Sequence, residues 1–567
     1  MEMTIDGLSV TAAPGESLLQ LVRRLQLDSD SLASRPLAAK MAGEVFTLNY
    51  VPVRLHDDGS ERESLRRAAA AAAGAVRLLR YSDPAGRGVF VRTVQFVCFL
   101  AVHSLWPNAK ASMNCTLGSS IYFEVTQTPD FDAAVLKQKV SELIRQDIVL
   151  QRRRVPLEEA VDRYRSSGQE DKARLLSMRS TDYFDEYAYG DFADYYYGEL
   201  APSTGYLQTW DLLPVDGGFL FVCPDENVPD RLSEVPSMPH VFSVFSEGEQ
   251  WGRLMECTTA ADLNEMTASG RIRELIRVNE ALHEARFSQI ADMICGRGAR
   301  AVMLAGPSSS GKTTSANRLA IQLKVRGKQP IPISLDDYYL DRDRILPGPD
   351  GRVDLEHINT LDIDLFKSQL AQLLAGGEVE LPRFNFITGK RERSGNVLRL
   401  SEHSVLIVEG LHGLNPAMLP ADIAAGQIFR MYISPLLPLN LDNHNRIPTS
   451  YLRLLRRTVR DYETRGASVQ HTLSMWESVQ QGERRWIYPY QENADVIFNS
   501  SALYELAVLK RHIFPLLTDI QPEDECYDAV HAMVRILNYI QEADVDDEIP
   551  PTSIIREFIG GNTFYRQ

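Results

Sequence analysis

The stretch AGPSSSGKTTSANRLA, residues 305–320, decides the fold of the C-terminal half of this chain. It follows the apolar run ARAVML and has the spacing GxxxxGK[ST] from Gly306 to Thr313, after which the sequence suits a helix. A buried strand, a glycine-rich loop and a helix in this order predict a phosphate-binding loop. Backbone N–H groups and the helix N-terminus would surround the phosphates of a nucleoside triphosphate.

The loop itself supplies most of the predicted ATP-binding residues, which are Gly306, Pro307, Ser308, Ser309, Ser310, Gly311, Lys312, Thr313 and Thr314. In such a loop the lysine reaches the terminal phosphates and the hydroxyl after it binds Mg²⁺. A second metal-side group is expected at the end of a neighbouring strand, and SVLIVEG (404–410) places Glu409 there. The alternative is an ordinary acidic residue at a strand end.

A kinase needs a base for the acceptor hydroxyl and cations for the migrating charge, whereas an ATPase needs only water. The strand-like run PIPISL delivers Asp336 and Asp337 to the carboxyl edge of the predicted sheet, where ligands bind in open α/β folds. We therefore predict that Asp336 is the catalytic base and that Lys312 also takes part in catalysis. A solvated acidic loop is the alternative.

A cluster of arginines follows in TSYLRLLRRTVRDYETRG. Arg453, Arg456, Arg457 and Arg460 share one helix face, and four like charges repel unless an anion lies between them. We predict that Arg453 and Arg456 act on the transferring phosphoryl group and that Arg460 and Arg465 bind ATP. Arg465 and the glycine after it are typical of a mobile lid. A solvated basic face is the alternative.

Composition limits the classes of function that fit. The 567 residues are 44% hydrophobic and carry a formal net charge of -16, which argues against broad attraction to nucleic acid or anionic membrane. Six cysteines form no CxxC pair, which indicates reduced, mostly buried thiols. The N-terminus lacks a signal-peptide pattern, and the most apolar run, residues 96–102, is too short to span a bilayer. We expect a cytoplasmic protein without a membrane segment.

The pattern along the chain predicts five parts. Residues 1–62 suggest a β-rich unit with a hairpin turn at Asp6-Gly7 and a strand at 38–48, before a low-complexity run at 66–76. Residues 63–240 form an α+β unit, and 241–290 a helical connector. Short apolar strands alternate with helices over 291–510, which is typical of a mostly parallel α/β sheet. The last part, 511–567, suggests small helices.

Several motifs in order resemble the uridine kinase and phosphoribulokinase branch of P-loop kinases. They are GPSSSGKTT, SLDDYY, DLEHINTLDIDLF, PRFNF, VLIVEG, RLLRRTVRDYETRG and ADVIFN, which together cover about 210 residues. The resemblance implies that Asp336 is the base, that Glu409 is the acidic group on the metal side, and that the transfer and lid arginines are Arg453, Arg456, Arg460 and Arg465. The implied cofactors are ATP and Mg²⁺.

The same resemblance implies an acceptor-binding set, which is Asp336, Tyr339, Glu356, His357, Phe384, Arg391 and Arg453. This set departs from uridine kinases in three places. Their Asp-His-Pro element is similar to Glu356-His357-Ile358 here, and the tyrosine and histidine that hold the pyrimidine match Phe384 and Gly389. A phenyl ring can stack on a base, but the hydrogen bonds of the histidine are missing, so kinase chemistry is better supported than uridine specificity.

The front half resembles part of threonyl-tRNA synthetase. Residues 1–62 are similar to its TGS domain, a β-grasp module, and 63–240 to its editing domain through AVHSLWP and GDFADYYYGELAPSTG. The editing pocket's HxxxH and Cys-x-x-x-His pairs fall at Arg92, Phe96, Tyr196 and Leu200, so none of the four residues is retained. Such side chains cannot rebuild the pocket. The unit is expected to lack editing activity and to serve as a scaffold, an RNA-contacting surface or a sensor.

These observations predict an ATP-dependent nucleoside kinase, with uridine or cytidine as the acceptor. Two alternatives remain, which are an RNA-associated regulatory NTPase that contacts tRNA through its N-terminal half, and a phosphoribulokinase-like sugar kinase. Expected partners are ATP and a small-molecule acceptor, with homo-oligomerisation left open.

Overall fold

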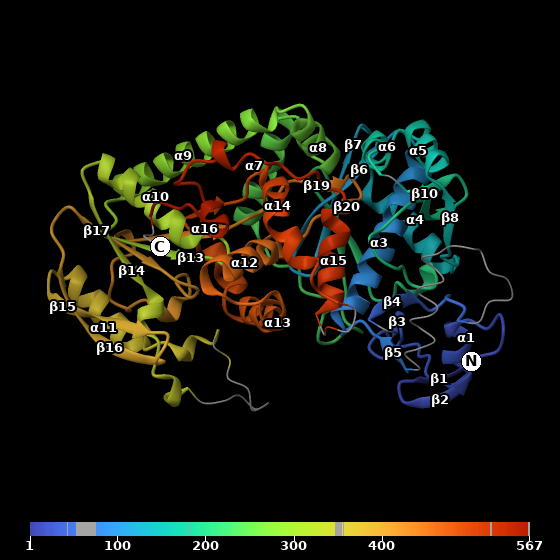
Figure 1. Cartoon of the computed structure of the whole chain (residues 1–567), viewed down its shortest axis with the longest axis horizontal. Helices are drawn as coiled ribbons and strands as arrows, with labels where there is room; N and C mark the ends of the chain where they lie inside the picture. The colour runs from blue at the N-terminus through green and yellow to red at the C-terminus, as the bar shows by residue number, and fades with distance from the viewer. Residues whose placement is uncertain are drawn as a thin grey trace.

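The structure, a computed structural model, describes every residue except 42, 53–74, 180, 346–353, 355, 522, 523, 525 and 565–567. The molecule is elongated (Figure 1). The N-terminal sheet lies at one end and the strands β14 and β17 lie near the other. The long helix α9 (Ile272–Arg297) runs along the upper edge between the two ends.

The N-terminal unit is a five-stranded sheet in the order β2-β1-β5-β3-β4 that packs on α1 (Leu18–Arg24). Its strands are β1 (Glu2–Ile5), β2 (Leu8–Thr11), β3 (Ala38–Met41), β4 (Glu44–Thr47) and β5 (Ala75–Leu79). Asp6 and Gly7 both have positive φ, which confirms the predicted hairpin turn.

Two predictions about this unit differ from the structure. The stretch predicted as one strand at 38–48 is the β3–β4 hairpin, because Gly43 with a φ of 82° reverses the chain. β5 pairs with β1 and β3, so the sheet extends to Leu79 and beyond the boundary predicted at residue 62. The predicted low-complexity run at 66–76 lies almost wholly outside the described residues.

The second unit packs α3 (Pro84–Leu105) and α4 (Ala133–Arg145) on a four-stranded sheet in the order β11-β12-β7-β6. These strands are β6 (Lys110–Leu117), β7 (Ser120–Thr126), β11 (Asp211–Val215) and β12 (Gly218–Val222). A three-stranded sheet, β10-β9-β8, lies beside α5 (Leu157–Ser166) and α6 (Glu170–Ser177). Its strands are β8 (Arg152–Pro156), β9 (Tyr183–Tyr189) and β10 (Phe192–Asp194).

Among the described residues, α3 is the one helix that could cross a membrane by its length and composition. Its most apolar 18-residue window is 67% buried inside the protein. Such burial is expected of a core helix, so the apolar character of α3 is weak evidence for a membrane span. Four of the six cysteines are buried, in agreement with the prediction of mostly buried thiols.

Three helices connect this half to the rest of the chain, which are α7 (Pro239–Leu254), α8 (Ala260–Ala268) and α9. The C-terminal half is built on a parallel sheet in the order β14-β17-β13-β18-β21. Its strands are β13 (Ala301–Ala305), β14 (Gln329–Ser334), β17 (Ser404–Glu409), β18 (Ile428–Ser434) and β21 (Val496–Asn499). The residues of β13 are almost fully buried, which a parallel sheet covered on both faces requires. The predicted α/β fold is confirmed.

The remaining elements surround this sheet. They are α10 (Lys312–Val325), α11 (Ile363–Leu374), the hairpin β15 (Glu378–Asn385) and β16 (Lys390–Arg399), the hairpin β19 (Asn440–Asp442) and β20 (Asn445–Arg446), α12 (Thr449–Arg465), α13 (Val469–Trp486), α14 (Glu505–Leu517), α15 (Tyr527–Leu537) and α16 (Arg556–Ile559). One apolar core joins α5, α6 and α8 to α12, α14 and α15, so the two halves share buried surface.

Candidate active site

The phosphate loop connects β13 to α10 at the carboxyl edge of the sheet. Gly306 has no room for a side chain, because a Cβ there would lie 2.2 Å from the carbonyl oxygen of Ile433. Gly311 adopts a φ of 84° and Ser309 a φ of 57°, conformations that turn the chain sharply into the helix. The predicted strand, loop and helix are therefore present.

The carbonyl groups of the loop are bound from outside. The carbonyl oxygen of Ser308 accepts from Arg453 at 3.2 Å, and that of Ser309 accepts from Arg456 at 3.3 Å. The carbonyl of Ser310 accepts from the hydroxyl of Ser500 at 2.6 Å. Because a trans peptide places its N–H opposite its C=O, the contacts at Ser308 and Ser310 turn the N–H groups of Ser309 and Gly311 toward the inside of the loop. The N–H of Ser310 donates to the carbonyl of Pro307 at 3.2 Å. This arrangement suits an anion.

Arg453 and Arg456 lie behind the loop in full burial. Each side chain is 1% exposed, and each forms a two-pronged ion pair, Arg453 with Glu483 and Arg456 with Glu505. Glu483 also accepts from the backbone N–H of Ser308 at 2.9 Å. The role of both arginines at the transferring phosphoryl group stays a prediction. Their charges are neutralised, and they support the loop.

Lys312 lies among acidic groups at the other side of the loop. Its ammonium donates to the carbonyl oxygens of Gly306 and Pro307 at 2.9 and 3.0 Å. Burial lowers the pKa of Lys312, while the carboxylates of Glu409 and Asp336 act in the opposite direction. The structure therefore brings together Lys312, the predicted base Asp336 and the predicted magnesium ligand Glu409.

Sheet register explains how Asp336 reaches this place. Ser334 at the end of β14 pairs with Glu409 at the end of β17, so the residues that follow emerge at one edge. Asp336 is accessible to solvent, yet desolvation by the surrounding protein raises its pKa. Lys312 lowers this pKa, Asp337 raises it, and Arg465 lowers it. A carboxylate that is accessible and faces Lys312 has the surroundings that a proton acceptor needs.

Thr313 and Glu409 fit a magnesium ion. The hydroxyl of Thr313 lies 3.3 and 3.4 Å from the two carboxylate oxygens of Glu409, and both groups offer the oxygen ligands that Mg²⁺ prefers. Burial raises the pKa of Glu409 to about 7, and Lys312 opposes this shift. A cation at this place would favour the charged form of the carboxylate.

The predicted acceptor side forms an aromatic cluster. The ring of Tyr339 lies 5.5 Å from that of Phe384 and 6.4 Å from that of Phe386, measured between centroids. Asp337 fixes this cluster, because its carboxylate accepts from the backbone N–H of Phe384 at 3.1 Å. A larger residue at position 389 would collide with Arg342, since a Cβ at Gly389 would lie 2.6 Å from Cδ of that side chain.

The other predicted acceptor residues differ in their surroundings. Burial raises the pKa of Glu356 to about 7, and Glu483 adds to the rise. His357 packs edge-on against Trp486, and its Nδ1 accepts from the backbone of Asn359 at 3.0 Å. Arg391 forms an ion pair with Asp362 at 2.6 Å. The charge of Lys312 lowers the pKa of Glu356, and that of Asp336 raises it.

The lid arginines gather around one buried carboxylate. Asp461 contacts Arg457 at 3.3 Å, Arg460 at 2.8 Å and Arg465 at 3.5 Å. α12 ends here, and Gly466 follows with a φ of 63°. The side chain of Arg465 remains 59% exposed, and its charge lowers the pKa of Asp336.

The C-terminal segment covers the start of α10, which the sequence did not indicate. The carboxylate of Glu557 accepts from the backbone N–H of Thr314 at 3.1 Å and from its hydroxyl at 2.7 Å. Asn562 donates to the same hydroxyl at 3.3 Å, and Ile554 lies against Gly311. A carboxylate thus occupies an anion-binding position of the helix N-terminus. Glu557 is 243 residues from Thr314, so no local pattern reveals the contact.

The comparisons with known proteins agree with this geometry. Residues 301–507 match the model of the Phosphoribulokinase / Uridine kinase family. A uridine kinase from Vibrio atlanticus is 30% identical over 221 residues, which are 38% of this chain and 95% of the relative. This chain belongs to that family. Its kinase region is hereafter residues 301–507.

The front half has a different relative. A threonine–tRNA ligase from Clostridium kluyveri is 24% identical over 279 residues, which cover 48% of this chain and 39% of the ligase.

The solved D-glycerate 3-kinase from Cryptococcus neoformans is 17% identical and covers 47% of this chain and 90% of its own, with a TM-score of 0.21. That score is too low to support a functional comparison.

The ligase-like half has a packed interior where the editing pairs would lie. Phe96, Tyr196 and Leu200 belong to one apolar core, and the rings of Phe96 and Tyr196 are 6.5 Å apart. Arg92 donates to the carbonyl of Glu199 at 3.0 Å. The predicted loss of the four residues is thus accompanied by a filled interior.

We expect Arg456 and Glu505, one of the two buried ion pairs behind the phosphate loop, to contribute to stability as a unit. Arg456→Met or Glu505→Leu alone leaves a buried charge without its partner and should lower the free energy of unfolding by about 3–5 kcal/mol. The double variant should lose less than the sum of the two single losses. Urea denaturation measures this. Arg393→Met serves as the control, because Arg393 is 90% exposed in its pair with Glu380 and should cost under about 1 kcal/mol. Single variants as stable as this control would contradict the assignment.

Proposed function

We propose that this protein is an ATP-dependent nucleoside kinase that transfers the γ-phosphoryl group of ATP to a nucleoside 5′-hydroxyl, with uridine or cytidine as the acceptor. The observation that carries the proposal is the sheet register, which pairs Ser334 with Glu409 and so places Asp336, two residues on, at the edge where Glu409 contacts Thr313 of the phosphate loop. The charges of Lys312 and Asp336 also act on each other's pKa in opposite directions. An accessible carboxylate at this place suits the deprotonation of an acceptor hydroxyl.

The chemistry follows from these placements. Lys312 would hold the β- and γ-phosphates, and the inward N–H groups of the loop would orient them. Asp336 would accept the proton of the acceptor hydroxyl. The oxygen of that hydroxyl would attack the γ-phosphorus, and ADP would leave. Arg465 is the cation proposed to meet the migrating charge. Thr313 and Glu409 would hold Mg²⁺, which supplies charge neutralisation at the phosphates.

The aromatic cluster supports an acceptor with a flat ring. Tyr339, Phe384 and Phe386 offer faces and edges against which a base can pack. Arg342 fills the space beside Gly389, the position that holds the pyrimidine-reading histidine in uridine kinases. This replacement favours loose selection among bases, and it is the observation that keeps a sugar kinase as the second candidate.

Two features count against an RNA-binding role for the front half. Arg153 and Arg154 of the basic run at 152–154 pair with Glu186 and Asp185, so their charges are compensated. Tyr195 and Tyr196 are buried and cannot stack on bases. We propose that the acceptor is a small molecule in the cytoplasm.

A panel of nucleosides and sugars with labelled ATP tests the proposal. Asp336→Asn should reduce transfer by about 10²–10⁴-fold, because the amide cannot accept the proton, while ATP still binds. Asp337→Asn is the matched control, since its amide oxygen can still accept from Phe384 and most activity should remain. If no acceptor on the panel is phosphorylated, or if both variants match the unmutated protein, the proposal is wrong.

The carboxylate at the start of α10 leads to a second expectation. Glu557 must lie close to the phosphates when ATP binds, and like charges repel. Glu557→Gln keeps the hydrogen bonds without the charge and should tighten ATP binding by about tenfold. Isothermal titration calorimetry measures the affinity.

The control for Glu557 removes the same charge elsewhere. Glu548 pairs with Arg273 and Arg277 on α9. Glu548→Gln should leave the affinity for ATP unchanged. Weaker binding in Glu557→Gln would instead assign this carboxylate to holding the nucleotide.

A further inference from the structure

A hairpin of the kinase region is inserted into the ligase-like half. β19 and β20 follow the buried strand β18 and lead directly into α12. His444 at the turn stacks on Phe99 of α3, with ring centroids 3.6 Å apart and planes 11° from parallel. Phe99 lies less than one helical turn beyond Phe96, so the hairpin reaches the region that replaces the editing pocket.

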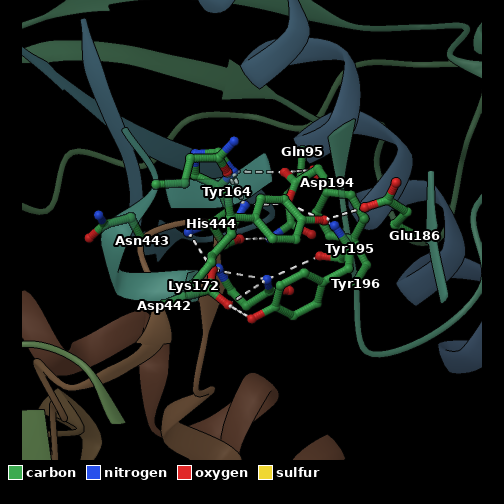
Figure 2. Close-up of polar contacts among 12 residues, drawn as sticks. Gln95, Tyr164, Lys172, Glu186, Asp194, Tyr195, Tyr196, Asp442, Asn443 and His444 are labelled. Carbon is green, nitrogen blue, oxygen red and sulfur yellow. Dashed lines mark hydrogen bonds and ion pairs between the residues drawn. The ribbon is translucent and has the colours of Figure 1, made fainter. Parts of the chain in front are cut away.

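His444 joins a buried polar network, as Figure 2 shows. Its Nδ1 lies 2.7 Å from both the ammonium of Lys172 and a carboxylate oxygen of Asp194. Its carbonyl accepts from the side-chain amide of Gln95 at 3.2 Å. Lys172 also pairs with Asp194, and both side chains are almost wholly buried. Removing the hairpin would deprive this buried ion pair of a partner, which is costly.

The other residues of the hairpin are bound as closely. Tyr195 donates to the carboxylate of Asp442 at 2.7 Å, and its carbonyl accepts from Asn445 at 3.1 Å. The backbone of Asn443 donates to Asp171 at 2.7 Å and accepts from the backbone of Met113 at 2.9 Å. Every one of these partners belongs to the ligase-like half. The hairpin is therefore held as a bound peptide would be.

The bound hairpin leads straight to the phosphate loop. Two residues, Ile447 and Pro448, separate β20 from α12, and Ile447 is fully buried. Arg453 and Arg456 lie on the first two turns of α12 and bind the carbonyls of Ser308 and Ser309. Arg457 adds a bond of 2.8 Å to the hydroxyl of Ser308. A shift of the start of α12 would therefore move the loop.

We propose that the ligase-like half has become an internal anchor of the kinase, whose resident ligand is the β19–β20 hairpin and whose effect is to position α12 and the phosphate loop. The residues of the hairpin and Tyr195 are positioning residues that act through the α12 arginines. For its functional consequence, this inference rests on the kinase function proposed above. Its structural part does not depend on that function.

Tyr195→Phe tests the anchor in the full-length protein. The variant removes one hydroxyl and its bond to Asp442, and Tyr81→Phe is the matched control. Tyr81 lies in the same half, is equally buried and donates to the carbonyl of Pro224 at 3.0 Å, away from the hairpin. Hydrogen exchange of residues 306–311 and 449–465 should speed up by about fivefold in Tyr195→Phe and stay unchanged in Tyr81→Phe.

Steady-state kinetics supply the second readout. The KM for ATP should rise several-fold in Tyr195→Phe, and further in His444→Ala, while kcat changes less, because the loop is displaced and the base is not. Faster exchange confined to residues 84–222, with the KM for ATP unchanged, would overturn the inference. A protein that phosphorylates nothing would refute the proposed function alone, because the exchange experiment needs no nucleotide.

Discussion

The buried arginine–carboxylate pairs behind the phosphate loop are the interaction on which the site depends. Arg453 with Glu483 and Arg456 with Glu505 bind the carbonyls of Ser308 and Ser309 from outside the loop, which turns the N–H of Ser309 toward its inside. Two charges buried together are costly unless they are well bonded. Here the carboxylates and the loop carbonyls bind the terminal nitrogens of both arginines, and Nε of Arg453 is the one guanidinium nitrogen of this pair of side chains without a hydrogen bond among the described residues. Protein groups hold the shape of the loop, and a loop held in this way costs less to order when a ligand binds.

The site that results is strongly acidic around one lysine. Lys312 is influenced by the carboxylates of Glu409, Asp336, Glu557 and Glu483. Burial raises the pKa of Glu409 and of Glu356 to about 7, so both carboxyl groups exchange a proton close to neutral pH. Such a site favours a metal-bound nucleotide over a free one, because the phosphates alone would add negative charge to an already negative surface.

The front half has a well-packed fold without the residues that would form an editing pocket. The positions of the editing pairs are filled by Phe96, Tyr196, Leu200 and Arg92, while the neighbouring surface of α3 and β10 binds the kinase hairpin. One apolar core then crosses from α5 and α6 to α12 and α14. Fold and function are separable in this domain, since the packing of its elements persists while its polar groups now face a segment of the same chain.

The sequence alone determined the phosphate loop, the parallel sheet, the order of the kinase motifs and the loss of the editing residues. These are local patterns, in which a strand, a glycine turn and a helix occupy consecutive residues from 301 to 325. The same reasoning placed Asp336 and Glu409 at one sheet edge, because parallel strands end together. It could not assign the α12 arginines. Periodicity puts Arg453 and Arg456 on one face of a helix, but only tertiary packing placed Glu483 and Glu505 opposite them. The contacts of Glu557 and His444 join residues more than 240 positions apart, and side-chain partners at such separation are set by how the halves pack.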